Sequence, residues 1–299
     1  MKLCSACSQD LPKEKFSKKQ WQAKQQRRCK ECIADNREVN LGAPNDGPPF
    51  PGADGDEGAL RLRDEDLFKQ PPARDECPIC MLTLPIHYAD SGYRACCGKI
   101  FCNGCMHAIQ TEGNRELCPF CRSPGISSDQ YIERIKKRVE GGDDAAAIYQ
   151  LGCDYYLGEH GLRQNFKKAN KLWLRAGELG LAVAYCKIGY AYYNGQGVEK
   201  DAKKAKHYSE LAAMGGEVVA RHDLGAMEWN EGDTSRAVKH WMVSAGAGFD
   251  ESLKVIRQCF LDGHVTKDDF EQALRAHKDS KDEMRSEQRE AAAAYYDEN

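Results

Sequence analysis

The second half of the chain carries apolar residues at helical spacing. The first such stretch is Tyr131, Ile132, Ile135 and Val139. Apolar side chains three and four positions apart lie on one face of an α-helix, and the pair Gly141-Gly142 ends the pattern. From Ser128 onward we therefore predict helices.

The helical region repeats itself. Three alanines, Ala169, Ala205 and Ala237, follow one another at similar intervals, and Gly180, Gly216 and Gly248 keep the same two intervals. A further pair of residues marks an earlier helix in each unit: Leu151-Gly152, Ile188-Gly189 and Leu224-Gly225. Small residues let two helices cross closely, and a glycine can end the second helix. Each unit is predicted to be a helical hairpin, with a degenerate fourth unit around Ala273.

These repeats resemble a known family. The segment Gly195-Gln196-Gly197-Val198 and the pair Lys204-Ala205 are similar to the loop and second helix of Sel-one-like repeats, which are relatives of the tetratricopeptide repeat. The resemblance covers about residues 145–275. It implies an α-solenoid that binds a protein partner and has no catalytic role of its own. A purely structural helical domain is the alternative.

The first part of the chain, 1–40, contains a possible metal site built from two CxxC pairs. Cys4 and Cys7 form the first pair, and Cys29 and Cys32 form the second. So short a segment cannot build a sufficient apolar core, and four thiolates around one zinc ion would replace it. We predict a small ribbon-like or treble-clef-like zinc finger. Free thiols or two disulfides are the alternatives.

The same segment is basic, with ten Lys and Arg against five Asp and Glu. The basic residues between positions 13 and 30, near Phe16 and Trp21, could contact nucleic acid or an acidic protein. A lysine-rich finger is more often simply solvated, so nucleic acid is not the favoured partner. The net charge of the whole chain is only -3.

A second block contains eight cysteines in four pairs: Cys77 and Cys80, Cys96 and Cys97, Cys102 and Cys105, Cys118 and Cys121. Their order resembles a RING finger. The resemblance implies an interleaved cross-brace, in which the first and third pairs hold one zinc ion and the second and fourth pairs hold another. Lys99 stands where the family usually has a histidine, and Cys96-Cys97 would supply the missing sulfur. His87 or His107 in place of one cysteine, and an incomplete second site, stay open. With the first finger, the expected cofactor is three zinc ions.

The RING resemblance also implies a partner and a role. RING fingers hold a ubiquitin-conjugating enzyme and its ubiquitin in a reactive orientation, without a nucleophile of their own. Ile79, Ile109 and Pro119 match the apolar groove for the conjugating enzyme, although many members have tryptophan where Ile109 stands. Arg122 matches the residue that joins ubiquitin to the enzyme. The sequence shows no catalytic residue of another kind.

Together these patterns predict a mostly α-helical protein with two small zinc-stabilised modules ahead of a solenoid of helical hairpins. The expected boundaries are a finger at 1–40, a flexible acidic, Pro- and Gly-rich linker at 41–73, a RING-type module at 74–127, repeats at 128–275 and a charged helical tail at 276–299. The predicted function is a RING-type ubiquitin ligase whose repeats recruit a substrate or scaffold. A non-enzymatic adaptor, associated with other proteins, nucleic acid or chromatin, is the alternative.

The sequence predicts no membrane association, because no apolar run approaches the roughly 18 residues of a membrane helix. Residues 1–10 lack the apolar core of a secretion signal. Fifteen cysteines without an export signal indicate a reducing compartment, in which metal ligation is a commoner use of cysteine than a disulfide. We therefore expect the protein in the cytoplasm or the nucleus.

Overall fold

The computed structural model describes residues 2–3, 10–11, 62–69, 71–111 and 117–297. The chain divides into two units, Met1–Leu60 and Arg61–Asn299. In the first unit, strands β1 (Lys2–Leu3) and β2 (Asp10–Leu11) form a short antiparallel pair. The predicted ligands Cys4, Cys7, Cys29 and Cys32 and the basic residues between positions 13 and 30 lie outside the described residues.

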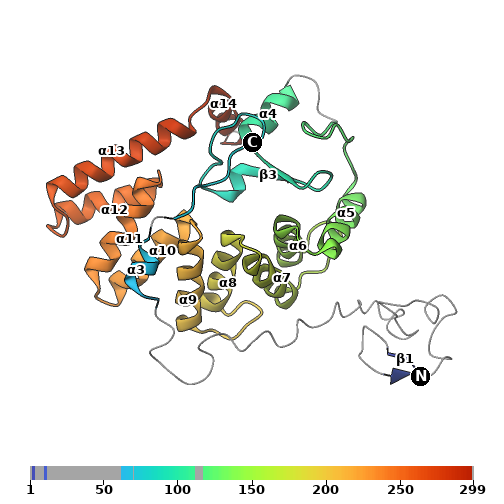
Figure 1. The fold of residues 1–299 in the computed structure, drawn as a ribbon, viewed down its shortest axis with the longest axis horizontal. Helices are drawn as coiled ribbons and strands as arrows, with labels where there is room; N and C mark the ends of the chain where they lie inside the picture. The colour runs from blue at the N-terminus through green and yellow to red at the C-terminus, as the bar shows by residue number, and fades with distance from the viewer. Residues whose placement is uncertain (1, 4–9, 12–61, 70, 112–116, 298–299) are drawn as a thin grey trace. The chain divides into compact units, whose positions relative to one another are not determined.

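The second unit is mainly helical, as predicted (Figure 1). Its repeat region contains α5 (Ser128–Gly141), α6 (Ala145–Leu157), α7 (Phe166–Glu178), α8 (Ala182–Asn194), α9 (Ala202–Met214), α10 (Val218–Asn230), α11 (Thr234–Gly246), α12 (Asp250–Leu261) and α13 (Lys267–Met284). The helices pack pairwise, α6 with α7, α8 with α9, α10 with α11 and α12 with α13, and neighbouring pairs are also in contact. The predicted solenoid of helical hairpins is confirmed.

Small residues bring the two helices of a hairpin together. Gly152 of α6 faces α7, and a Cβ atom there would lie 2.6 Å from the Trp173 indole nitrogen. Ala169 beside it is fully buried. After α7, Gly180 adopts a φ of 94°, which is a left-handed conformation that glycine tolerates and that ends the helix. The residues that repeat in the sequence are therefore those that the hairpin geometry requires.

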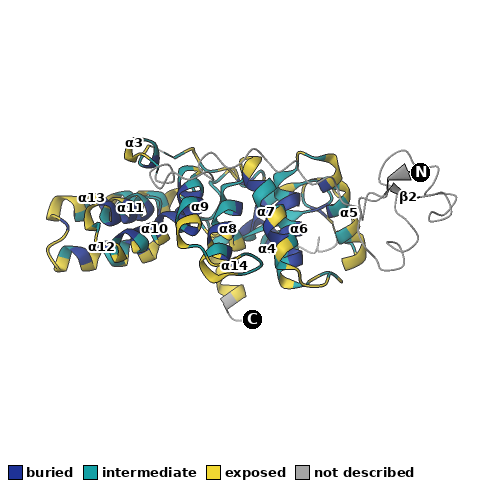
Figure 2. Cartoon of the chain, turned by 90° about the horizontal axis from the view of Figure 1, so that it is seen from below, coloured by how far each residue is buried: buried dark blue, intermediate teal, exposed yellow. Residues whose placement is uncertain are grey.

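The second helix of every hairpin begins with a side-chain cap. The capping residues are Asn165, Asp201, Asp233 and Thr266, and each accepts a hydrogen bond from the backbone N–H three positions later. Such a cap stabilises a helix by about 1 kcal/mol. Buried residues gather where neighbouring helices face one another (Figure 2). One continuous core joins Ile135, Ile148, Trp173, Ile188 and Tyr208 along the first hairpins.

A cysteine-rich module precedes the repeats. It contains the short 3-10 helix η2 (Tyr88–Asp90), the antiparallel strands β3 (Ser91–Arg94) and β4 (Lys99–Cys102), and helix α4 (Asn103–Thr111). Its small core combines Phe101 and Met106 with several cysteines. Two further helices contact other parts of the unit: α3 (Asp64–Leu67) lies against α9, and the C-terminal α14 (Glu287–Asp297) packs on α4.

Polar contacts connect the cysteine-rich module to the first repeat helices. Arg138 of α5 donates from Nε to the carbonyl oxygen of Ala95 (2.7 Å) and from Nη2 to that of Cys96 (3.1 Å). Its Nη1 and the Tyr93 hydroxyl both donate to the carboxylate of Asp144, each at 3.0 Å. Among the helices of the described residues, none is both long and apolar enough to cross a bilayer.

Candidate metal centre

The structure brings four predicted ligands together in a first cluster. Cys77 and Cys80 come from a CxxC loop, Cys102 ends β4, and Cys105 lies in the first turn of α4. The sulfur atoms of Cys77 and Cys105 are 3.8 Å apart, as are those of Cys80 and Cys102. All four sulfurs lie within 4.8 Å of one another.

The remaining four cysteines of the block form a second cluster. Cys96 and Cys97 lie in the turn between β3 and β4, and Cys118 and Cys121 belong to a second CxxC loop. The sulfurs of Cys97 and Cys118 are 3.8 Å apart. The two clusters interleave along the chain, and this is the grouping that the RING resemblance implies.

The two CxxC loops have the same backbone structure. Met81 and Arg122 follow the last cysteine of each loop and adopt positive φ angles of 59° and 60°. Each donates its N–H back to the carbonyl of the first cysteine, Cys77 or Cys118, at 2.9 Å. A left-handed residue other than glycine costs about 1 to 2 kcal/mol. This backbone conformation closes a tight turn in each loop, and the turn directs the two sulfurs of the loop to the same point.

The donor set and its spacing fit a tetrahedral metal ion. Four sulfurs about 2.3 Å from one zinc ion lie about 3.8 Å from each other. A disulfide would require sulfurs only about 2.05 Å apart, and within the described ranges the cysteines are free thiols. Four thiolates at tetrahedral spacing suit zinc or an iron–sulfur site. The arrangement can therefore hold one metal ion in each cluster.

Burial keeps several of these thiols in their neutral form when no cation is bound, although hydrogen bonds lower the pKa of Cys77 and Cys121. The pKa of Cys96 is raised to about 12, mainly by burial, and burial also raises the pKa of Cys97 and Cys105. Deprotonating several of these groups side by side without a counter-charge is unfavourable, because thiolates repel one another and are poorly solvated. A bound divalent cation reverses this preference and keeps its ligands deprotonated.

Helix α14 supplies a charged neighbour to the first cluster. Arg289 donates from Nη1 to the Thr83 carbonyl (2.8 Å), and its Nη2 lies 3.7 Å from the Cys80 sulfur. Gly104 of α4 allows this approach, since a Cβ atom there would lie 2.7 Å from the Arg289 side chain. Arg289 is not among the site residues predicted from the sequence. It lies far from Cys80 along the chain, so no local pattern points to it.

The residues expected to bind a conjugating enzyme lie on the surface of this module. Ile79 is 38% exposed, Arg122 is exposed, and Ile109 and Pro119 are half-buried. Three large apolar residues that the sequence analysis did not name are also exposed nearby in the chain: Met81, Leu117 and Phe120. Single exposed apolar side chains are common on protein surfaces, but a contiguous group of them can form a contact surface.

Other side chains that the sequence analysis considered as ligands have different contacts. The His87 ring lies 5.6 Å from that of Phe249, and the His107 ring lies 5.1 Å from that of Tyr295. Neither belongs to a four-sulfur cluster of the described residues. Lys99 is exposed, and its ammonium lies 5.6 Å from the centre of the Phe120 ring.

The repeat region matches a known family. Residues 145–181 and 182–217 match the model of the Sel1 repeat. These segments coincide with the hairpins α6–α7 and α8–α9 and the turns that follow them. The chain therefore contains Sel1 repeats, which confirms the predicted repeat class and indicates a scaffold for protein–protein interaction.

Two curated relatives share sequence with the chain. The ERAD-associated E3 ubiquitin-protein ligase component HRD3B of Arabidopsis thaliana is 29% identical over 133 residues, which is 44% of this chain and 20% of that protein. Cytochrome c oxidase assembly factor 7 of Homo sapiens is 27% identical over 137 residues, which is 43% of this chain and 59% of that protein. The matches thus span only part of either relative.

Two solved structures are similar to part of the chain. A Sel1 repeat protein from Oxalobacter formigenes has a TM-score of 0.46 at 22% identity and covers 60% of this chain and 71% of its own. The protective antigen c5321 of uropathogenic Escherichia coli, which displays an SLR fold, has a TM-score of 0.43 at 25% identity and covers 54% of this chain and 34% of its own.

Proposed function

We propose that the protein is a zinc-dependent RING-type ubiquitin ligase whose Sel1 repeats recruit the protein to be modified or a scaffold. The observation that carries the proposal is the pair of interleaved four-cysteine clusters, with sulfur separations of 3.8 Å. Neither cluster has an open position that a catalytic metal would need. The proposed metals are therefore structural.

Zinc would be held by Cys77, Cys80, Cys102 and Cys105 in one cluster and by Cys96, Cys97, Cys118 and Cys121 in the other. A bound ion supplies a rigid cross-link between segments that share only a small core. A third ion would be held by Cys4, Cys7, Cys29 and Cys32. The cross-links fix the positions of the two CxxC loops and of α4, which carry the residues that face a partner.

The proposed partner surface consists of Ile79, Ile109 and Pro119. Burying an apolar side chain of this kind against a conjugating enzyme is worth roughly 1.5 to 3 kcal/mol. Arg122 follows the last ligand, and its planar guanidinium can donate to ubiquitin and to the enzyme together. The rate of ubiquitin transfer would increase through orientation, because the substrate amine and the enzyme's thioester are held in reacting geometry.

One relative adds support of a limited kind. HRD3B is described as a component of a ubiquitin-protein ligase, and its resemblance to this chain extends over 133 residues. A repeat scaffold within a ligase assembly is consistent with the proposal. The cysteine clusters, and not this resemblance, are the reason to place a ligase module in the chain itself.

The test is a reconstituted ubiquitination reaction with the full chain, activating enzyme, ubiquitin and a panel of conjugating enzymes. We expect ubiquitin chains with at least one enzyme, and we expect Ile79→Ala and Arg122→Ala each to slow chain formation by roughly ten- to a hundredfold. Lys254→Ala, an exposed position on α12, is the matched control and should leave the rate unchanged. No chains with any enzyme, from protein that holds its full zinc content, would remove the ligase proposal.

The alternative function is a non-enzymatic adaptor that uses the zinc modules as binding platforms. Ile109 favours it, since this side chain offers less contact area than the tryptophan of many RING fingers. In that case Ile79→Ala and Arg122→Ala would keep full cellular function. A nucleic-acid or chromatin adaptor would instead depend on the basic residues between positions 13 and 30, and its binding would weaken steeply with salt.

A further inference from the structure

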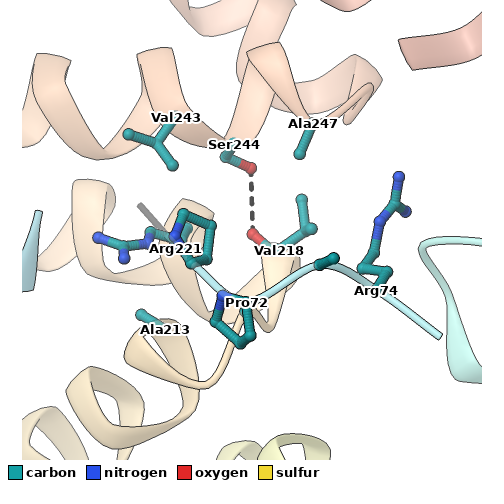
Figure 3. Close-up of a pocket in the computed structure, with 11 residues that line it drawn as sticks. Pro72, Arg74, Ala213, Val218, Arg221, Val243, Ser244 and Ala247 are labelled. Atoms are coloured by element: carbon teal, nitrogen blue, oxygen red, sulfur yellow. Dashed lines mark hydrogen bonds between the residues drawn. The ribbon is translucent and has the colours of Figure 1, made fainter. Parts of the chain in front are cut away.

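The segment just before the cysteine-rich module lies in a groove of the repeats. This segment is the end of the predicted linker, and within it Leu67 of α3 is fully buried. The chain then passes between α9 and α11, with Pro72 close to the turn at Gly216 (Figure 3). Val218 and Arg221 of α10 form the floor of this groove.

An aromatic side chain of the segment lies among cationic groups. The Phe68 ring centre is 5.9 Å from the Arg221 guanidinium, 5.6 Å from that of Arg236 and 5.6 Å from the Lys239 ammonium. The His240 ring is 4.6 Å away. Cations are attracted to the face of an aromatic ring within about 6 Å. These cationic groups suit an aromatic ring at this position.

An acidic side chain accompanies the aromatic one. Asp64, four positions before Phe68, forms an ion pair with Arg236. Arg236 is itself almost fully buried and also contacts Glu228, so the groove presents its charge at a defined position. Asp64 is exposed, and its pairing with Arg236 matches the cationic character of the groove.

The floor of the groove retains unused hydrogen-bonding capacity. Arg221 is 2% exposed, and no acceptor in the part of the chain that the structure describes reaches its Nε, Nη1 or Nη2. Both ring nitrogens of the fully buried His240 are likewise unpartnered there. A buried donor without an acceptor costs about 1 to 3 kcal/mol. A ligand with an additional carbonyl or carboxylate oxygen would remove part of this cost.

The segment does not fill the groove. A cavity of 220 Å³ remains between the segment and the helices, lined by Ala213, Val218, Arg221, Val243, Ser244 and Ala247. Most of these side chains are small or apolar, and Arg221 supplies the charge. A peptide with a larger side chain or an additional acidic group at this point would fit better than the chain's own segment.

We propose that the groove between α9 and α11 is the partner-binding site of the repeats. It takes a short peptide of another protein, in which an acidic residue stands four positions before an aromatic one and proline follows. In the free protein, the chain's own residues 63–69 and 71–74 occupy the groove in cis. This inference deepens the protein-binding part of the proposed function and does not require ubiquitin transfer. The cis segment ends shortly before Cys77, so its displacement would free the chain that leads into the first CxxC loop.

Tethering makes the cis segment an effective competitor. A segment joined to its site through the same chain acts at an effective concentration on the order of millimolar. A partner peptide with the same intrinsic affinity would therefore bind the intact protein weakly. Weakening the cis contact should strengthen binding in trans.

The test uses a fluorescent synthetic peptide with the sequence of residues 62–74 and the full-length chain. Phe68→Ala in the protein removes the central contact of the cis segment. We expect this variant to bind the peptide at least about tenfold more tightly than the unmodified chain does. Adding Lys239→Glu or Arg221→Gln to Phe68→Ala should reverse the gain, whereas Lys254→Glu on α12 should not. Asp64→Arg provides a second way to loosen the segment at an exposed position.

Three results would overturn the proposal. The first is no tighter binding by either Phe68→Ala or Asp64→Arg, with the helical circular dichroism unchanged. The second is equal binding of a scrambled peptide of the same composition. The third is a dimer of the unmodified chain that Phe68→Ala dissolves, since a second copy would then be the occupant. Running the ubiquitination reaction on the same samples separates the two proposals, because peptide binding without ubiquitin chains removes only the ligase.

Discussion

Replacing Arg289 tests how the C-terminal helix supports the first cysteine cluster. Arg289→Ala removes hydrogen bonds to the carbonyls of Thr83 (2.8 Å) and Leu82 (3.4 Å) in the cysteine-rich module, and it removes the cation that lies 3.7 Å from the Cys80 sulfur. A hydrogen bond from a charged donor contributes about 1.5 to 3 kcal/mol. Because Arg289 is only half-buried, we take the lower figure for each of the two bonds and expect a loss of about 3 kcal/mol.

This loss should appear as faster release of one metal ion. If release from the first cluster requires α14 to detach, about 3 kcal/mol corresponds to about a hundredfold increase in that rate. The assay is transfer of zinc to a colorimetric chelator, followed over time at neutral pH. We expect the phase that belongs to Cys77, Cys80, Cys102 and Cys105 to accelerate, and the phase that belongs to the second cluster to stay unchanged.

Arg285→Ala is the matched control. Arg285 precedes the same helix and pairs with Glu290, but both side chains are exposed. Exposed ion pairs contribute little to stability, so we expect no change in release. Equal release rates for Arg289→Ala and the unmodified chain would refute the idea that α14 stabilises the first cluster.

Three further predictions concern packing, pH and the metal. Gly104→Leu should displace α14, because even a Cβ atom at this position would lie 2.8 Å from the Arg289 backbone nitrogen. The displacement would appear as faster hydrogen exchange of the amides of α14 alone. Unchanged exchange in α14 would contradict the close approach of the two helices. Burial and the neighbouring cations lower the pKa of His240 to about 3. The unfolded chain therefore binds one proton more than the folded chain as pH falls from about 6.5 towards 3, and stability should fall by up to about 1.4 kcal/mol per pH unit in this range relative to His240→Gln. The measurement is the free energy of unfolding of both proteins at several pH values between 4 and 6.5. The same pH dependence in the two proteins would disprove this prediction. Removing metal with a chelator should abolish the near-ultraviolet circular dichroism of the cysteine-rich module. Most of the far-ultraviolet helical signal should stay, because the repeats have their own core. Complete unfolding would show instead that the module and the repeats are one cooperative unit.

The hairpin repeats were accessible from the sequence because their requirements recur at fixed spacing. The alanines and glycines that mark each unit lie at helix crossings and helix ends. The caps Asn165, Asp201 and Asp233 recur at the same intervals as the alanines, so the starts of the second helices are also marked in the sequence. In the last hairpin, more residues separate the cap Thr266 from Ala273 than separate the other caps from their alanines. Ala273 therefore lies about one turn later in its helix.

Other features depend on contacts between distant segments. The grouping of the eight cysteines came from a family resemblance, because spacing alone leaves several pairings open, and the structure places the same groups together. The segment at 62–73 was assigned to a linker by composition, since single apolar residues such as Leu67 and Phe68 in a polar stretch show no periodicity. The partners of this segment lie much later in the chain, on α9 to α11. Arg289 could not be predicted either, because its partners in the cysteine-rich module lie far from it along the chain.

The most direct test of the account is the metal content of intact chains, measured by native mass spectrometry on protein prepared under reducing conditions. We predict three zinc ions per chain. A variant with Cys97→Ala and Cys118→Ala should hold two, and so should one with Cys80→Ala and Cys105→Ala. An unmodified chain that carries no metal, or paired substitutions that leave the zinc count unchanged, would contradict the central claim that the two four-cysteine clusters are zinc sites.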